Sequence, residues 1–140
     1  MPEGDAMTAG AQGPVVLVVD DNFPYRSLAI AMLQARGISA EGAEDADQAL
    51  KCLQERPYAL VLLDINMPGM SGNDLCRMMR RQLGMTTVPI IAYTADGLGT
   101  TPEAALAAGF DGVLLKPLAA ARLDQLLATH GIRAETTALA

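Results

Sequence analysis

The sequence predicts an α/β fold in which a five-stranded parallel sheet is doubly wound, with helices on both of its faces. Short apolar runs recur about every 20 to 30 residues, and each is followed by a turn and a stretch with helical spacing. These runs are apolar on both faces, which is typical of buried parallel strands. The 140 residues suit one domain and are too few for an eight-fold α/β barrel, which needs about 250.

Five runs are predicted as strands because β-branched and aliphatic residues dominate them and turn residues bound them. The second run is weak, because it is short and polar residues follow it. In chain order, the predicted strands are Val15–Asp20, Ile38–Ala40, Ala59–Asp64, Val88–Thr94 and Gly112–Leu115.

Helices are predicted where apolar residues recur at three- and four-residue spacing between and after the strands. In chain order these residues are Ala29, Ile30 and Leu33; Ala46, Ala49, Leu50 and Leu53; Leu75, Cys76 and Met79; and Leu123, Leu126 and Leu127. Thr101, Pro102 and Glu103 predict the start of a further helix, with proline at its first position. Gly37 and Gly109 stand where a helix end favours glycine. The fold is therefore expected to have five helices.

Composition limits the classes of function. The net charge of −6 disfavours nucleic acid or an anionic membrane as the main partner. The apolar runs fall far short of the roughly 20 residues that span a bilayer, and the first ten residues lack a secretory signal. Cys52 and Cys76 have no metal-binding spacing. We expect a cytoplasmic domain at 14–130, between a flexible leader at 1–13 and a flexible tail at 131–140.

Acidic residues end two of the predicted strands. Asp20 and Asp21 close the first, and Asp64 closes the third. In a doubly wound sheet of the flavodoxin-like order 2-1-3-4-5, ligand sites form at the carboxyl edge between the first and third strands. The three carboxylates are therefore expected to converge there. Thr94 and Lys116, which end the fourth strand and follow the fifth, should face the same edge.

Such a cluster favours Mg²⁺ and phosphate chemistry. Two like charges 4 Å apart cost roughly 4 kcal/mol at an effective dielectric constant near 20, and either protonation or a hard cation relieves that cost. Oxygen ligands favour Mg²⁺, which keeps waters and so leaves room for a phosphate. Lys116 and Thr94 would neutralise phosphoryl oxygens, and Asp64 would serve as a carboxylate nucleophile.

The chain resembles the receiver domain of response regulators in two-component signalling, over about residues 15–130. Four motifs carry the resemblance, in this order and at these spacings: VLVVDDN at 16–22, LLDINMPGMSG at 62–72, IIAYTA at 90–95 and GFDGVLLKP at 109–117.

The resemblance implies a role for each acidic residue. Asp64 matches the phosphoacceptor of the family, and Asp20 and Asp21 match the acidic pair that positions Mg²⁺. Asn66 matches the residue whose backbone carbonyl is a metal ligand.

The resemblance also implies roles near the ends of the last two strands. Thr94 matches the switch hydroxyl, and Ala95 matches the small residue that leaves the acceptor accessible. Lys116 matches the family's lysine, which Pro117 follows in what is usually a cis bond. The chain departs from the family at Val113, where an aromatic residue usually takes part in the switch. The departure leaves phosphorylation intact and puts the usual output mechanism in question.

The expected function is a phosphoacceptor module that takes a phosphoryl group from a histidine kinase or a histidine phosphotransfer protein and is not otherwise an enzyme. Two alternatives remain: an aspartate-nucleophile phosphatase of the haloacid-dehalogenase type, and a receiver-like docking module that is never phosphorylated. The phosphatases carry a second aspartate two residues after the nucleophile, where this chain has Asn66, and they need a cap region. The motifs suit equally a free-standing receiver and one fused to a hybrid kinase.

Val113 leads to a prediction about the switch. Valine is short and stiff, so it cannot swing between buried and exposed positions as a ring does. The segment 96–99 holds two glycines and is the expected substitute. Beryllofluoride, a phosphoryl mimic, should therefore shift amide resonances mainly at 94–101 in NMR spectra. Largest shifts around Val113 and the last helix, with 96–101 unchanged, would contradict this account.

Overall fold

A computed structural model describes residues 14–95 and 102–134, and the predicted α/β architecture is confirmed there. Its sheet has five parallel strands in the order β2-β1-β3-β4-β5, as the sequence predicts. The strands are β1 (Val15–Val19), β2 (Ser39–Ala43), β3 (Leu60–Asp64), β4 (Ile90–Thr94) and β5 (Gly112–Leu115). The sheet therefore reverses its order of winding between β1 and β3, where the acidic residues are expected.

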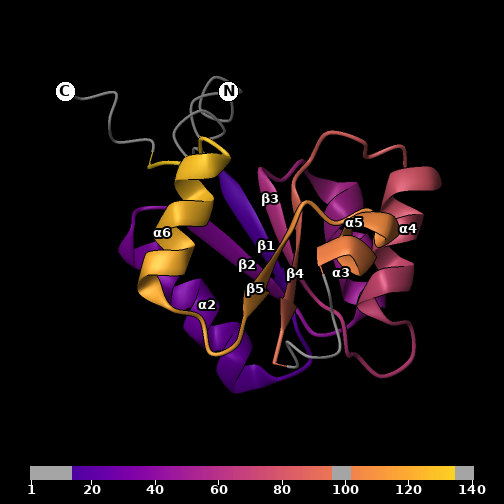
Figure 1. Ribbon diagram of the computed structural model, residues 1–140, viewed down its shortest axis with the longest axis horizontal. Helices are drawn as coiled ribbons and strands as arrows, with labels where there is room; N and C mark the ends of the chain where they lie inside the picture. Colours follow the sequence, from indigo (N-terminus) through magenta and orange to yellow (C-terminus); the bar gives the residue numbers. More distant parts are fainter. Residues whose placement is uncertain (1–13, 96–101, 135–140) are drawn as a thin grey trace, which may run out of the picture.

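Helices cover both faces of the sheet. Figure 1 shows α2 and α6 on one side and α3, α4 and α5 on the other. Their bounds are α2 (Phe23–Ala35), α3 (Ala46–Glu55), α4 (Gly72–Arg81), α5 (Pro102–Ala108) and α6 (Ala120–Thr129). These are the five helices of the described residues. None of them is long and apolar enough to cross a membrane.

Two apolar cores lie on opposite faces of the sheet. Every residue of β1, β3 and β4 is buried, and successive side chains enter the two cores in turn. Leu33 of α2 and Leu123 of α6 belong to one core. Leu53 of α3 and Met79 of α4 belong to the other. The helical periodicity of the sequence therefore identified the buried faces correctly.

Strand β2 differs most from its prediction. It runs from Ser39 to Ala43 rather than over Ile38–Ala40, and it pairs with β1 along its whole length. Only Ala43 of the strand is buried, because β2 is an edge strand whose outer side meets solvent. Polar residues at such an edge carry no apolar periodicity, so the sequence pattern could not locate the strand.

Short polar side chains set the starts of three helices. Asn22, Asp45 and Ser71 each accept a hydrogen bond from a backbone N–H in the first turn of the helix that follows. Pro102 begins α5 as predicted, whereas Thr101 lies outside the described residues. The backbone at Gly37 and Gly109 is left-handed, as expected at helix ends.

The first residues of the segment 131–140, expected as a tail, pack against the end of α6. The N–H groups of Gly131 and Ile132 donate to the carbonyls of Ala128 and Leu127, which closes the end of α6 after His130. Ile132 packs into the core beneath α2 and α6. The leader at 1–13 and residues 135–140 lie outside the described part of the chain.

Arg80 joins the segments at the amino ends of β4 and β5. Its guanidinium donates to the backbone carbonyls of Met85, Val88 and Gly109, at 2.7 to 3.0 Å. It also donates to the carboxylate of Asp111 at 2.7 Å, and the same carboxylate accepts a hydrogen bond from the N–H of Ile90. One side chain, 15% exposed, thus satisfies acceptors from two loops, the one between α4 and β4 and the one between α5 and β5.

We expect Arg80→Leu to lower the free energy of unfolding by about 2 to 4 kcal/mol, because several acceptors lose their shared donor. Chemical denaturation would measure the loss. Arg81→Leu is the matched control: Arg81 is exposed on the same helix, and its replacement should change stability by less than about 0.5 kcal/mol. Equal losses in the two variants would contradict a specific role for Arg80.

Candidate functional site

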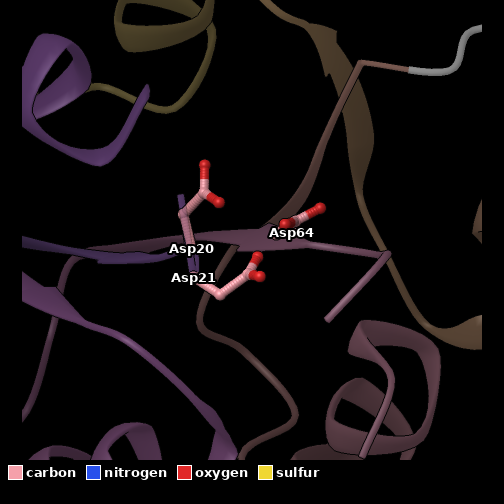
Figure 2. Close-up of side chains that lie close together, drawn as sticks. All are labelled: Asp20, Asp21 and Asp64. Carbon is pink, nitrogen blue, oxygen red and sulfur yellow. The ribbon is translucent and has the colours of Figure 1, made fainter. Parts of the chain in front are cut away.

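The three predicted carboxylates converge at the carboxyl edge of the sheet. Asp20 and Asp21 directly follow β1, and Asp64 is the last residue of β3. One oxygen from each lies within 4.8 Å of the others, and Figure 2 shows the three side chains gathered around one space. Asp20 and Asp64 are buried and Asp21 is exposed, so the cluster opens to solvent on the side of Asp21.

The chain after β3 is folded closely around Asp64. The N–H of Asn66 donates to Oδ1 of Asp64, at 3.0 Å. The N–H of Gly72 donates to the carbonyl of Ile65, which brings the start of α4 against the end of β3. A Cβ at position 72 would lie 2.1 Å from the carbonyl oxygen of Asp64, so only glycine fits there. The loop therefore fixes the direction of the Asp64 carboxylate.

Asp20 is held by the backbone around it. Its N–H donates to the carbonyl of Ala43 in β2, and its Oδ1 accepts the N–H of Asn22. The guanidinium of Arg26, one turn into α2, donates a hydrogen bond to the backbone carbonyl of Asp20 at 2.8 Å. Asp20 consequently keeps one carboxylate oxygen, Oδ2, directed at the centre of the cluster.

Lys116 brings positive charge into the cluster. Its Nζ lies 2.7 Å from Oδ2 of Asp20 and 3.4 Å from Oδ2 of Asp64, and its side chain is only 4% exposed. Its N–H donates to the carbonyl of Thr94, which aligns the chain after β5 with the end of β4. The bond to Pro117 is cis, as the resemblance implied.

The predicted switch residues lie beside this cluster. Thr94 is fully buried at the end of β4, one residue beyond Tyr93, which pairs in register with Asp64. Ala95 follows it and is exposed. Val113 lies in β5, in register with Ala92, and is partly buried against the core beneath α3, α4 and α5. The segment 96–99, expected to carry the conformational change, lies outside the described residues.

The electrostatics of the site follow from burial and from like charge. Burial raises the pKa of Asp64 to about 7, and the neighbouring Asp20 adds to the rise. The N–H of Asn66 and the ammonium of Lys116 act in the opposite direction. Three carboxylates face one ammonium, so further positive charge would stabilise the ionised form of Asp64.

The ligand set fits Mg²⁺. All three side chains offer oxygen, the ligand that Mg²⁺ prefers, and their mutual distances suit a shared cation. Oδ2 of Asp20 is buried and, among the described residues, accepts no hydrogen bond, although the ammonium of Lys116 lies close to it. An ion pair holds this oxygen, so a metal ion could share it. Asn66 follows Asp64 closely enough to add its carbonyl, the role that the resemblance implies.

Two tyrosines at the site were not identified from the sequence. The rings of Tyr25 and Tyr93 lie with their centroids 4.9 and 5.0 Å from Nζ of Lys116. The contact joins α2, β4 and the segment after β5, which are far apart in the chain. No spacing rule connects such residues, so only the folded structure reveals them.

Comparisons with known proteins agree with this geometry. The family described as "Response regulator receiver domain" matches residues 16–128. The sensor histidine kinase AruS of Pseudomonas aeruginosa is 42% identical over 113 residues, which cover 79% of this chain and 11% of that protein. The chain therefore spans about a tenth of the length of this curated relative.

Solved structures show the same fold. The receiver domain of a sensor histidine kinase from Pseudomonas aeruginosa PAO1, crystallised with a magnesium ion in its active site cleft, is 32% identical, with a TM-score of 0.76 over 85% of this chain and 98% of that one. The chemotaxis protein CheY4 of Vibrio cholerae is 31% identical, with a TM-score of 0.75 over 84% and 98% of the two chains. The family match, the relative and the fold agree: the chain belongs to the response regulator receiver domains of two-component signalling.

Proposed function

We propose that this receiver domain accepts a phosphoryl group from a phosphohistidine onto Asp64, with Mg²⁺ bound, and acts as a phosphorylation-controlled switch. The observation that carries the proposal is the cluster itself: three carboxylates within 4.8 Å of one another, with the buried ammonium of Lys116 against two of them. The Mg²⁺ reported in the active site of the Pseudomonas receiver supports the same cation here.

The transfer requires a nucleophile, an open approach and charge neutralisation. A carboxylate oxygen of Asp64 forms a bond to phosphorus while the bond from phosphorus to the donor's imidazole nitrogen breaks, and that nitrogen keeps the electron pair. Bound Mg²⁺ would neutralise phosphoryl oxygens and favour the ionised form of Asp64. Water later attacks the acyl phosphate and resets the switch.

The surrounding residues position and stabilise the phosphoryl group. Lys116 supplies a positive charge next to Asp64, and Thr94 supplies a hydroxyl at the end of the neighbouring strand. Ala95 has only a methyl group, so it leaves the approach to Asp64 open. The N–H of Asn66 keeps one oxygen of Asp64 engaged, and its carbonyl would complete the metal ligands.

The partner proposed from the relatives is a histidine kinase or a histidine phosphotransfer protein, because matched proteins such as AruS are sensor histidine kinases. The phosphatase alternative is disfavoured, since Asn66 stands where such enzymes need an acid. The docking-module alternative is also disfavoured, because every proposed group for phosphorylation is present. We propose no enzymatic activity beyond self-catalysed phosphorylation and dephosphorylation.

Phosphorylation should be confined to Asp64. Incubation with phosphoramidate and Mg²⁺ should add one phosphoryl group that hydroxylamine removes, as mass spectrometry of the intact chain would show. Asp64→Asn should abolish the addition, whereas Asp74→Asn, at an exposed aspartate of α4, should leave it unchanged. Equal labelling of Asp64→Asn and the wild type would contradict the assignment, and turnover of a generic phosphomonoester would favour the phosphatase.

Mg²⁺ should stabilise the fold through the carboxylate cluster. A ligand that binds only the native state stabilises it by about 2.7 kcal/mol at 100 times its Kd, so the melting temperature should rise with Mg²⁺ concentration. Asp21→Ala should abolish this response, because it removes a ligand, and should not destabilise the metal-free protein, because it relieves repulsion. Asp47→Ala removes an equal charge at an exposed position of α3, and it should leave the response to Mg²⁺ intact. An undiminished response in Asp21→Ala would place the metal elsewhere.

A further inference from the structure

The ammonium of Lys116 is surrounded by two kinds of group. Oxygens of Asp20 and Asp64 lie at 2.7 and 3.4 Å, and the rings of Tyr25 and Tyr93 lie 4.9 and 5.0 Å away, measured to their centroids. Both ring distances are within the range in which the negative face of an aromatic ring attracts a cation. We call Tyr25 and Tyr93 the tyrosine pair.

The backbone of Tyr25 and the side chain of Tyr93 are held by contacts that do not involve the lysine. The N–H of Tyr25 donates to the side chain of Asn22, the residue that caps α2. Tyr93 is fully buried in β4, and its hydroxyl donates to the carbonyl of Tyr25 at 3.3 Å. Burial raises the pKa of the Tyr93 phenol, so the hydroxyl keeps the proton that it donates. The ring of Tyr93 is therefore in place independently of the lysine, and α2 brings the ring of Tyr25 against the same ammonium.

The lysine needs this contact with the rings for two reasons. Its flexible four-carbon side chain loses rotamer freedom when its charge is fixed in one place. In addition, its nearer partner is Asp20, at 2.7 Å, rather than the proposed acceptor Asp64, at 3.4 Å. A divalent cation held by oxygens of Asp20 and Asp64 would repel the ammonium. Attraction to the rings would oppose that repulsion and keep the ammonium beside Asp64.

We propose that Tyr25 and Tyr93 are positioning residues for phosphotransfer: their rings hold the ammonium of Lys116 at the acceptor carboxylate. The inference rests on the proposed function, since it concerns the same reaction. Neither ring needs to touch the phosphoryl group. Both act through Lys116, so their contribution should vanish when Lys116 is absent.

The contact can be detected without metal and without activity. The chain has only two lysines, Lys51 and Lys116. Lysine labelled with ¹³C would therefore give two sets of side-chain NMR signals, and exposed Lys51 would be the internal reference. Ring currents of the tyrosine pair should displace the ε-methylene signal of Lys116. Tyr25→Leu should move this signal towards that of Lys51, and Tyr25→Phe, which keeps a ring, should not.

The rate of phosphorylation tests the consequence. We expect Tyr25→Leu to lower the rate constant with phosphoramidate and saturating Mg²⁺ about tenfold, within the strength of a desolvated contact between a cation and a ring. Tyr25→Phe should stay within about twofold of the wild type. Phe23→Leu is the matched control, because Phe23 is 66% exposed in the same helical turn and its ring faces Arg26 instead.

A double-mutant cycle separates positioning from packing. In a Lys116→Ala background, Tyr25→Leu should have no further effect on the rate. Melting temperatures measured in parallel show that each variant is folded, and Tyr93→Phe, which keeps the buried ring, gives a second test with an expected rate close to the wild type. Rescue by phenylalanine combined with non-additivity would support the inference.

Three results would overturn it. The Lys116 signal could stay unchanged in Tyr25→Leu, the rate could stay unchanged, or the rate could fall equally with and without Lys116. In each case the wild-type protein would still be phosphorylated, so the proposed function would stand although the role of the tyrosine pair would not. A wild type that takes up no phosphoryl group would overturn the proposed function itself, and the inference with it.

Discussion

The structure depends on an electrostatic constraint at the carboxyl edge of its sheet: three carboxylates share a small volume with one buried ammonium. Such an arrangement is unfavourable in isolation, as the raised pKa of Asp64 indicates. It persists because rigid strand ends and short loops set the positions of Asp20 and Asp64. The excess of negative charge would favour a divalent cation, and in the proposed function that cation and Lys116 would together offset the negative charge of an incoming phosphoryl group.

Stability and chemistry are separated across the sheet. At the amino ends of β4 and β5, Arg80 satisfies acceptors from the two loops that precede these strands, so this edge is held by well-paired polar groups. At the carboxyl ends, the backbone carries the constraint instead: Gly72 closes against Asp64 where no Cβ fits, and the N–H groups of Asn22 and Asn66 fix one oxygen of each buried carboxylate. The remaining oxygen of each carboxylate faces the ammonium of Lys116 and could be shared with a ligand.

The tyrosine pair around Lys116 and the valine at position 113 concern different stages of the proposed signalling. Tyr25 and Tyr93 surround the lysine and would act on phosphotransfer, before any conformational change. Val113 lies on β5, and its predicted role concerns the conformational response that would follow. With valine in place of the aromatic residue usual in the family, that response would need another element with two packings. Measured separately, phosphorylation rates and structural changes would therefore respond to different residues of this chain.

The sequence by itself determined the alternation of strands and helices, the buried faces of the helices and the carboxylate cluster, because these follow from periodicity and from the rule that parallel strands end at one edge. The same rule placed Thr94 and Lys116 at that edge, and the strand order came from the flavodoxin-like fold class that the pattern predicts. Strand β2 was misplaced, since the small and polar residues of Ser39–Ala43 carry no strong apolar period. Only the tertiary structure decided that Lys116 lies closer to Asp20 than to Asp64, and that Tyr25 and Tyr93 meet its ammonium. These contacts join side chains from separate elements, and their geometry is set by packing, for which linear spacing carries no signal.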